Sequence, residues 1–287
     1  MEIKNKLIAL AKIIGVYVGF YLIFLVISYP IQWIFTLEFR RSNAWGIIGQ
    51  GLLTIVAVFF FFLVLKIFGK KSKPASGIGL TKNWYLRYLT GIGIGIICII
   101  ILWLFAIVFG GMSSYKKTLD SEQLNITLIF LVVFLLAGIS EEIMARGYMA
   151  YAGHTGGRIF SAIIISIIFS VVHPWENMNL FSVINLFLWS IGAFLFTWLS
   201  GDLWMVIGFH FSWNAAMGCL FGVPVSGRIV GGIFESKYTE QNFINGGDYG
   251  FEGTFICSIL LLILIGICIY LMKHNKIKNN SKVLWLK

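Results

Sequence analysis

Two adjacent glutamates, Glu141 and Glu142, interrupt a long apolar run, and Arg146 follows the second of them by four residues. Side chains at positions i and i+4 share a helix face, so Glu142 and Arg146 are expected to form a structural ion pair, whereas Glu141 is turned away from that line. Burying a charge in a membrane costs about 2.5 to 3.5 kcal/mol on insertion scales, so such groups usually pair or line a cavity. We therefore expect Glu141 to face an internal cavity, where a carboxylate can take a proton from water.

Two further apolar segments carry polar side chains. His173 lies four residues after Phe169 and directly before Pro174, which disfavours helical geometry for the preceding residue, so His173 is expected to project from a helix end. His210 and Asn214 are also four residues apart, and both can donate hydrogen bonds to a developing oxyanion. Each residue alone is more often structural. Together, a glutamate, two histidines and an asparagine on three separate helices would be costly to bury without a purpose.

The composition of the 287-residue chain places these side chains in a membrane. Hydrophobic residues make up 59% of the chain and charged residues 12%, with a mean hydropathy of +0.88, which is far from the balance of a soluble domain. Continuous apolar runs favour helices over barrel strands, in which apolar and polar residues alternate. We predict an all-α, polytopic bundle of about eight transmembrane helices, at residues 7–29, 46–68, 89–110, 124–145, 158–173, 179–199, 203–222 and 254–272.

The distribution of basic residues predicts the orientation of this bundle. With eight spans, both termini lie on one side of the membrane. Of the 22 lysines and arginines, 16 fall on that side, and six fall on the other: Arg40, Arg41, Lys116, Lys117, Arg228 and Lys237. The positive-inside rule then places both termini in the cytoplasm. Since the net charge of +10 reflects this asymmetry, we expect no nucleic-acid partner.

Cysteines and glycines have structural explanations. The four cysteines lie in or at the ends of apolar spans without C-x-x-C spacing, so neither a disulfide framework nor a thiolate metal site is expected. Gly91, Gly93 and Gly95 resemble a nucleotide-binding fingerprint only superficially, because no strand precedes them. Close packing of helices explains them better.

Three motifs in this chain resemble those of the CAAX protease and bacteriocin-processing family (CPBP, also called Abi), which includes the type II CAAX prenyl endopeptidases. They are E-E-x-x-x-R at 141–146, F-x-x-x-H at 169–173 and H-x-x-x-N at 210–214, in this order. The matched core, 141–214, is about a quarter of the chain. Ala145 departs from the family pattern, which often has a bulky aromatic residue before the arginine.

The resemblance implies an eight-helix intramembrane endopeptidase whose active site lies inside the bilayer and opens towards the cytoplasm. It implies that Glu141, with His173, holds and activates the attacking water. His210 and Asn214 would stabilise the oxyanion of the tetrahedral intermediate. The expected substrate is a membrane-associated or lipidated peptide, such as a prenylated CAAX peptide, a pheromone precursor or a bacteriocin.

The resemblance also implies that Glu142 and Arg146 support and orient the site. A glutamate with two histidines could hold zinc, and Glu141, His173 and His210 would then be its ligands. No H-E-x-x-H motif is present, and a carboxylate and an imidazole can activate water alone. We therefore favour a metal-independent, glutamate-type mechanism without a cofactor.

The chain divides into four predicted parts. These are a peripheral N-terminal helix pair with a basic loop (1–73), a CPBP-like catalytic membrane core (74–222), an extramembrane loop to which we assign no role (223–253), and a C-terminal helix with a basic tail (254–287). Short loops and the lack of organelle signals favour a bacterial plasma membrane. Membrane lipids and a peptide substrate are the expected partners, and the oligomeric state is not predicted.

Two other classes of function stay open. In an ion-coupled transporter, Glu141, His173 and His210 would form a proton or cation relay, although such proteins more often show internal repeats, and we find none. In a non-proteolytic immunity or scaffold protein, the chain would bind a bacteriocin or a sensor kinase without cutting it. A Glu141→Ala variant that keeps the cellular phenotype would favour this last class.

Overall fold

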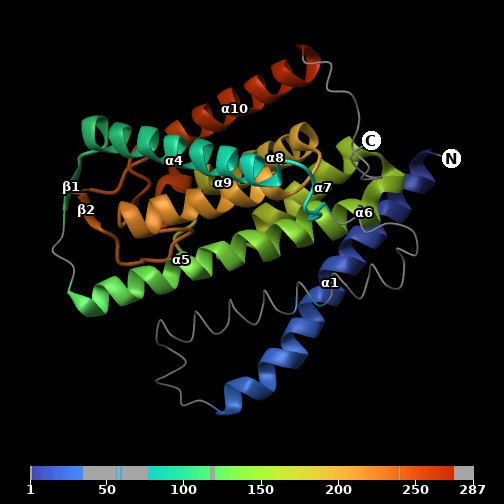
Figure 1. Cartoon of the computed structure of the whole chain (residues 1–287), viewed down its shortest axis with the longest axis horizontal. Helices are drawn as coiled ribbons and strands as arrows, with labels where there is room; N and C mark the ends of the chain where they lie inside the picture. Colours follow the sequence, from blue (N-terminus) through green and yellow to red (C-terminus); the bar gives the residue numbers. More distant parts are fainter. Residues whose placement is uncertain are drawn as a thin grey trace.

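The computed structural model describes residues 2–34, 56, 59, 77–116, 120–238 and 240–274, and these form a helical bundle with one small sheet (Figure 1). The helices are α1 (Glu2–Ile34), α4 (Trp84–Phe109), α5 (Ser121–Glu142), α6 (Ala150–Gly153), α7 (Arg158–Val171), α8 (Leu180–Ser200), α9 (Trp204–Ala215) and α10 (Phe255–His274). The predicted all-α membrane bundle is thus confirmed as a mostly helical fold.

Seven of the eight predicted spans coincide with helices. The remaining one, the second span at 46–68, lies outside the described residues apart from two positions. Within the described part of the chain, five helices are long and apolar enough to cross a membrane. The fifth predicted span corresponds to the shorter helix α7. The count of eight spans and the cytoplasmic termini stay predictions.

Two helices continue beyond their α-helical part as π-helices. The backbone after Glu142 is π-helical over Ile143–Met149 before it continues into α6, and the backbone after α9 is π-helical over Ala216–Leu220. Single π-helical turns are frequent at functional sites. Here one begins directly after Glu142 and the other two residues after Asn214, so both adjoin a sequence motif.

Helix α4 packs closely against α9 through glycines. A Cβ atom at Gly91 would lie 2.0 Å from the Met205 carbonyl oxygen, and one at Gly95 would lie 2.1 Å from the Ser212 hydroxyl oxygen. Side chains at these two positions would therefore push the helices apart. Close packing is confirmed for Gly91 and Gly95, whereas Gly93 has open space around its Cβ position. This contact fixes α9, which carries two of the predicted site residues.

A small sheet joins the two segments that follow α4 and α9. Strand β1 (Met112–Lys116) pairs with the antiparallel strand β2 (Phe234–Tyr238), with Ser114 opposite Ser236. The sequence did not predict this sheet. It lies at one end of the bundle, beyond the end of α4 (Figure 1), and it ties the segment between α9 and α10 to the helices.

Candidate active site

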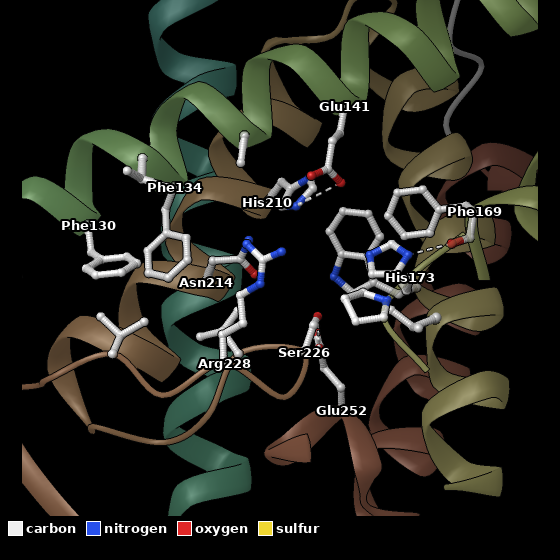
Figure 2. Close-up of a pocket in the computed structure, with 17 residues that line it drawn as sticks. Phe130, Phe134, Glu141, Phe169, His173, His210, Asn214, Ser226, Arg228 and Glu252 are labelled. Carbon is white, nitrogen blue, oxygen red and sulfur yellow. Dashed lines mark hydrogen bonds and ion pairs between the residues drawn. The ribbon is translucent and has the colours of Figure 1, made fainter. Parts of the chain in front are cut away.

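A cavity of about 160 Å³ lies between the helices and the segment that follows α9 (Figure 2). Glu141 of α5 and His173, which follows the end of α7, line this cavity. His210 and Asn214 of α9 line it as well. The structure therefore brings the four predicted catalytic residues, which come from three separate segments, to one cavity.

Glu141 stands at the end of an apolar face of α5. Phe130, Phe134, Ala137 and Glu141 are spaced by four, three and four residues, so they project from one side of the helix, and all four line the cavity. The Glu141 side chain is 28% exposed, and Figure 2 shows it pointing from α5 into the cavity. The carboxylate is thus accessible to a small molecule in the cavity.

Glu142, one residue further, lies in a different environment. Its side chain and that of Arg146 are both 0% exposed, and the two form the ion pair expected from their spacing, at 3.2 Å. Arg146 also donates from Nη2 to the Ser190 carbonyl oxygen at 3.0 Å and to the Ser190 hydroxyl at 2.6 Å. A buried charge pair is tolerated when hydrogen bonds satisfy it in this way.

Aromatic rings enclose the guanidinium of Arg146. Its Cζ atom lies 5.0 Å from the ring centre of Phe169, 5.6 Å from that of Trp189 and 5.1 Å from that of Phe194. Ring faces attract a cation, and more strongly where water is excluded. Phe169, the first residue of the F-x-x-x-H motif, therefore contributes to the surroundings of Arg146 as well as to the cavity.

His210 lies between the two glutamates. Its Nδ1 atom is 2.9 Å from Oε1 of Glu142, and its Nε2 atom is 4.0 Å from Oε2 of Glu141. The imidazole also packs edge-on against Trp189, with ring centres 4.6 Å apart. Because a carboxylate only accepts hydrogen bonds, the Nδ1–H group donates to Glu142. The sequence did not predict this contact, which joins residues 68 positions apart.

His173 projects from the end of α7, as its position before Pro174 predicts. Its Nδ1 atom lies 2.5 Å from the Phe169 carbonyl oxygen, and a carbonyl oxygen can only accept, so Nδ1 carries the proton. In the neutral ring, the lone pair is then on Nε2. Figure 2 shows the ring facing the cavity across from Glu141.

Asn214 is half-buried at the cavity wall. In the part of the chain that the structure describes, no side chain or backbone group forms a hydrogen bond with its carboxamide. The amide group therefore keeps its donors for a molecule in the cavity, whereas most buried amides are satisfied within the protein.

The possible zinc ligands Glu141, His173 and His210 share the cavity, but they do not form a metal site as arranged. Across the described ranges, no group of three or more histidine, cysteine, aspartate or glutamate side chains is arranged to hold a metal ion. The residues present therefore do not fit zinc in this arrangement, and we derive no chemical step through a metal.

The segment between α9 and α10 contributes cavity residues that the sequence reasoning missed. Ser226, Arg228 and Glu252 all line the cavity. Glu252 is 6% exposed, and its carboxylate accepts hydrogen bonds from Trp213 Nε1 at 3.2 Å and from the Ser226 hydroxyl at 2.7 Å. The turn-forming pair Ser226-Gly227 was the signal available in the sequence, but it does not indicate where the turn packs.

Comparison with known proteins agrees with the motif resemblance. Residues 123–216 match the family model described as Type II CAAX prenyl endopeptidase Rce1-like, and this range contains all three motifs. No curated protein and no solved structure matches the chain. The matched range begins in α5 and ends just after α9, so it covers the helices that carry Glu141, His173, His210 and Asn214. Residues 123–216 of this mostly helical chain are therefore similar to the type II CAAX prenyl endopeptidase Rce1-like family.

Proposed function

We propose that the protein is an intramembrane endopeptidase that hydrolyses a peptide bond of a membrane-associated or lipidated peptide in this cavity. The family match supports endopeptidase activity in general. The observation that carries the proposal is the convergence of Glu141, His173, His210 and Asn214 on one cavity. This set contains a base, a second water-binding group and two hydrogen-bond donors, which are the groups that addition of water to an amide requires.

Glu141 acts as the general base in this proposal. A water molecule donates one hydrogen bond to the Glu141 carboxylate and the other to the lone pair on Nε2 of His173. Glu141 takes the proton as the water oxygen attacks the peptide carbonyl, and the same carboxyl group then gives the proton to the departing amine. A positioned side chain of this kind contributes about 100- to 10,000-fold in rate.

Asn214 and His210 stabilise the oxyanion. The carboxamide of Asn214 donates from Nδ2, and a protonated His210 donates from Nε2 while Glu142 continues to accept from Nδ1. Donors that are already oriented cost no reorganisation when charge develops. Glu142 cannot serve as the base, because Arg146 and His210 already occupy its carboxylate.

The apolar face of α5 suits the proposed class of substrate. Phe130, Phe134 and Ala137 lead along the cavity wall to Glu141, so apolar side chains or a lipid chain can pack against them while the scissile bond lies at the carboxylate. We propose CAAX-type processing, pheromone maturation or bacteriocin self-immunity as the physiological context, in a bacterial plasma membrane, by a metal-independent mechanism.

The test is cleavage of a library of prenylated and unmodified peptides by detergent-purified protein, read by mass spectrometry. Wild type and Glu141→Gln are compared, and Glu122→Gln is the matched control because Glu122 is an exposed glutamate at the start of the same helix. We expect products from wild type and the control and none from Glu141→Gln. We also expect that treatment with EDTA leaves cleavage unchanged.

Cleavage by Glu141→Gln would overturn the mechanism. If wild type cleaves no peptide, and Glu141→Gln leaves the cellular phenotype intact, the non-proteolytic binding or immunity function is favoured instead. Activity that is lost in EDTA and restored by zinc would contradict the metal-independent form.

A further inference from the structure

Arg228 brings a positive charge into a cavity whose other titratable lining groups are the carboxyl groups of Glu141 and Glu252 and the imidazoles of the two histidines. Figure 2 shows its side chain pointing from the segment after α9 towards Asn214. Arg228 is exposed, and among the residues that the structure describes, no group forms an ion pair or hydrogen bond with its guanidinium. The proposed mechanism does not use this cation.

The backbone around Arg228 is a tight turn. Val225 and Arg228 exchange two backbone hydrogen bonds, both 2.9 Å long, and the residues between them have positive φ angles of 47° for Ser226 and 81° for Gly227. Positive φ at both central positions is the geometry of a type I′ turn. The turn defines where the Arg228 side chain leaves the backbone.

This turn is anchored to the helix that carries Asn214. Ser226 donates from its backbone N–H and its hydroxyl to Glu252, at 3.1 and 2.7 Å, and Glu252 also accepts from Trp213 of α9. The backbone N–H of Gly227 donates to the Tyr249 carbonyl oxygen at 3.3 Å. The base of the turn is thus held by several hydrogen bonds, whereas the guanidinium above it keeps its donors for a ligand.

We propose that Arg228 binds a carboxylate of the peptide substrate, so that the enzyme selects peptides with a negative charge close to the cleaved bond. This inference rests on the proposed endopeptidase function and adds a specificity-determining residue to it. The planar guanidinium matches a carboxylate with two parallel hydrogen bonds, and its charge offsets the repulsion that Glu141 exerts on an anionic peptide. The carboxylate belongs either to the free C-terminus of the peptide or to an aspartate or glutamate side chain.

The first experiment measures kcat/KM for three versions of one peptide that wild type cleaves: the free acid, the C-terminal amide, and a version in which acidic side chains are replaced by their amides. One of the two changes is expected to lower kcat/KM of wild type by about 10- to 100-fold, mainly through KM, because hydrogen bonds to charged groups contribute about 1.5 to 3 kcal/mol. Arg228→Gln should cleave all versions with nearly equal efficiency, and Arg228→Lys should keep part of the preference. Which change matters identifies the source of the carboxylate.

Lys237→Gln is the matched control, since Lys237 is an exposed cation of the same segment that pairs with Glu235 and does not line the cavity. It should keep the full preference of wild type. Equal losses on all three peptides in Arg228→Gln would place Arg228 at the oxyanion or in the structure and overturn the inference. Equal cleavage of the three peptides by wild type would also overturn it, while leaving the endopeptidase function intact.

A binding measurement keeps the inference testable without proteolysis. Fluorescence anisotropy compares three versions of a labelled farnesylated peptide: the free acid, the C-terminal amide, and a version in which acidic side chains are replaced by their amides. Their binding is measured on Glu141→Gln and on the double variant Glu141→Gln, Arg228→Gln. The acid, or the version that keeps its acidic side chain, should bind Glu141→Gln about 10-fold or more tightly than its neutral counterpart, and the double variant should not discriminate. If this binding preference is observed but wild type cleaves no peptide, the proposed endopeptidase function is refuted and the inference about Arg228 is not. Equal binding of all versions to both variants would refute the inference.

Discussion

Glu141 and Glu142 are neighbours in the sequence, yet they lie in two different regions of the molecule. The Glu142 side chain is 0% exposed and contacts both Arg146 and His210. The Glu141 side chain is 28% exposed, and its Oε2 atom lies 4.0 Å from Nε2 of His210. The surroundings therefore separate two identical carboxylates: that of Glu142 is held in a buried network of an ion pair and hydrogen bonds, and that of Glu141 lines the cavity.

His210 is the point where these two regions meet. One ring nitrogen contacts Glu142 in the buried network, and the other faces Glu141 in the cavity. The network of Glu142, Arg146 and Ser190 therefore orients a ring whose other edge lines the cavity. We expect changes in the buried region to alter stability first, and changes in the cavity to alter catalysis with little effect on stability.

Arg146→Ala should have the largest effect on stability. The change leaves Glu142 buried without its cationic partner, which typically costs about 3 to 5 kcal/mol of unfolding free energy. Thermal unfolding in detergent measures this loss. Arg158→Ala is the control, because Arg158 is an exposed arginine that stacks on Trp198 and should contribute less than about 1 kcal/mol. Equal melting of wild type and Arg146→Ala would show that the buried network is not structural.

Asn214→Ala, a change in the cavity region, should lower catalysis and leave stability nearly unchanged. Removal of one oxyanion donor lowers kcat by about 100- to 1000-fold, whereas melting should stay close to that of wild type because the carboxamide forms no hydrogen bond with the described residues. The measurement is kcat on a cleaved peptide together with the melting temperature. A variant with normal kcat would remove Asn214 from the mechanism.

Ile229→Cys should have no effect on activity, but it tells which side of the membrane the cavity faces. Ile229 is 79% exposed beside Arg228, whereas all four native cysteines are buried. The distribution of basic residues predicts that the segment 223–253 lies outside the cytoplasm. The family resemblance implies instead that the cavity opens towards the cytoplasm. Because residues of this segment line the cavity, the two predictions conflict. We expect a membrane-impermeant maleimide to label Ile229→Cys in intact cells. Labelling only after the cells are opened would favour the cytoplasmic opening.

The sequence predicted those features of the molecule that depend on interactions between residues close together in the chain. Helical periodicity and the cost of an unpaired buried charge gave the Glu142–Arg146 pair. Proline geometry placed His173 at a helix end, and the span positions followed from continuous apolar runs. Each of these depends only on residues a few positions apart.

The parts that the sequence did not predict depend on distant or subtle interactions. The contact of His210 with Glu142 requires the packing of α9 against α5, which no local pattern specifies. The π-helical segments differ from α-helix only in hydrogen-bond register, so composition does not reveal them. The turn before Arg228 is recognisable as Ser-Gly, but its place at the cavity depends on Glu252, 26 residues beyond Ser226.

The most direct test of the central claim is a comparison of Glu141→Gln with Glu142→Gln, in which peptide cleavage and thermal unfolding are measured for both variants. The account predicts that Glu141→Gln melts like wild type and loses about 100- to 10,000-fold of its cleavage rate. It predicts that Glu142→Gln is less stable by about 3 to 5 kcal/mol, because Arg146 loses its buried counter-ion. The opposite pattern, in which Glu141→Gln unfolds or still cleaves while Glu142→Gln melts like wild type, would contradict a catalytic role for Glu141 and a structural role for Glu142.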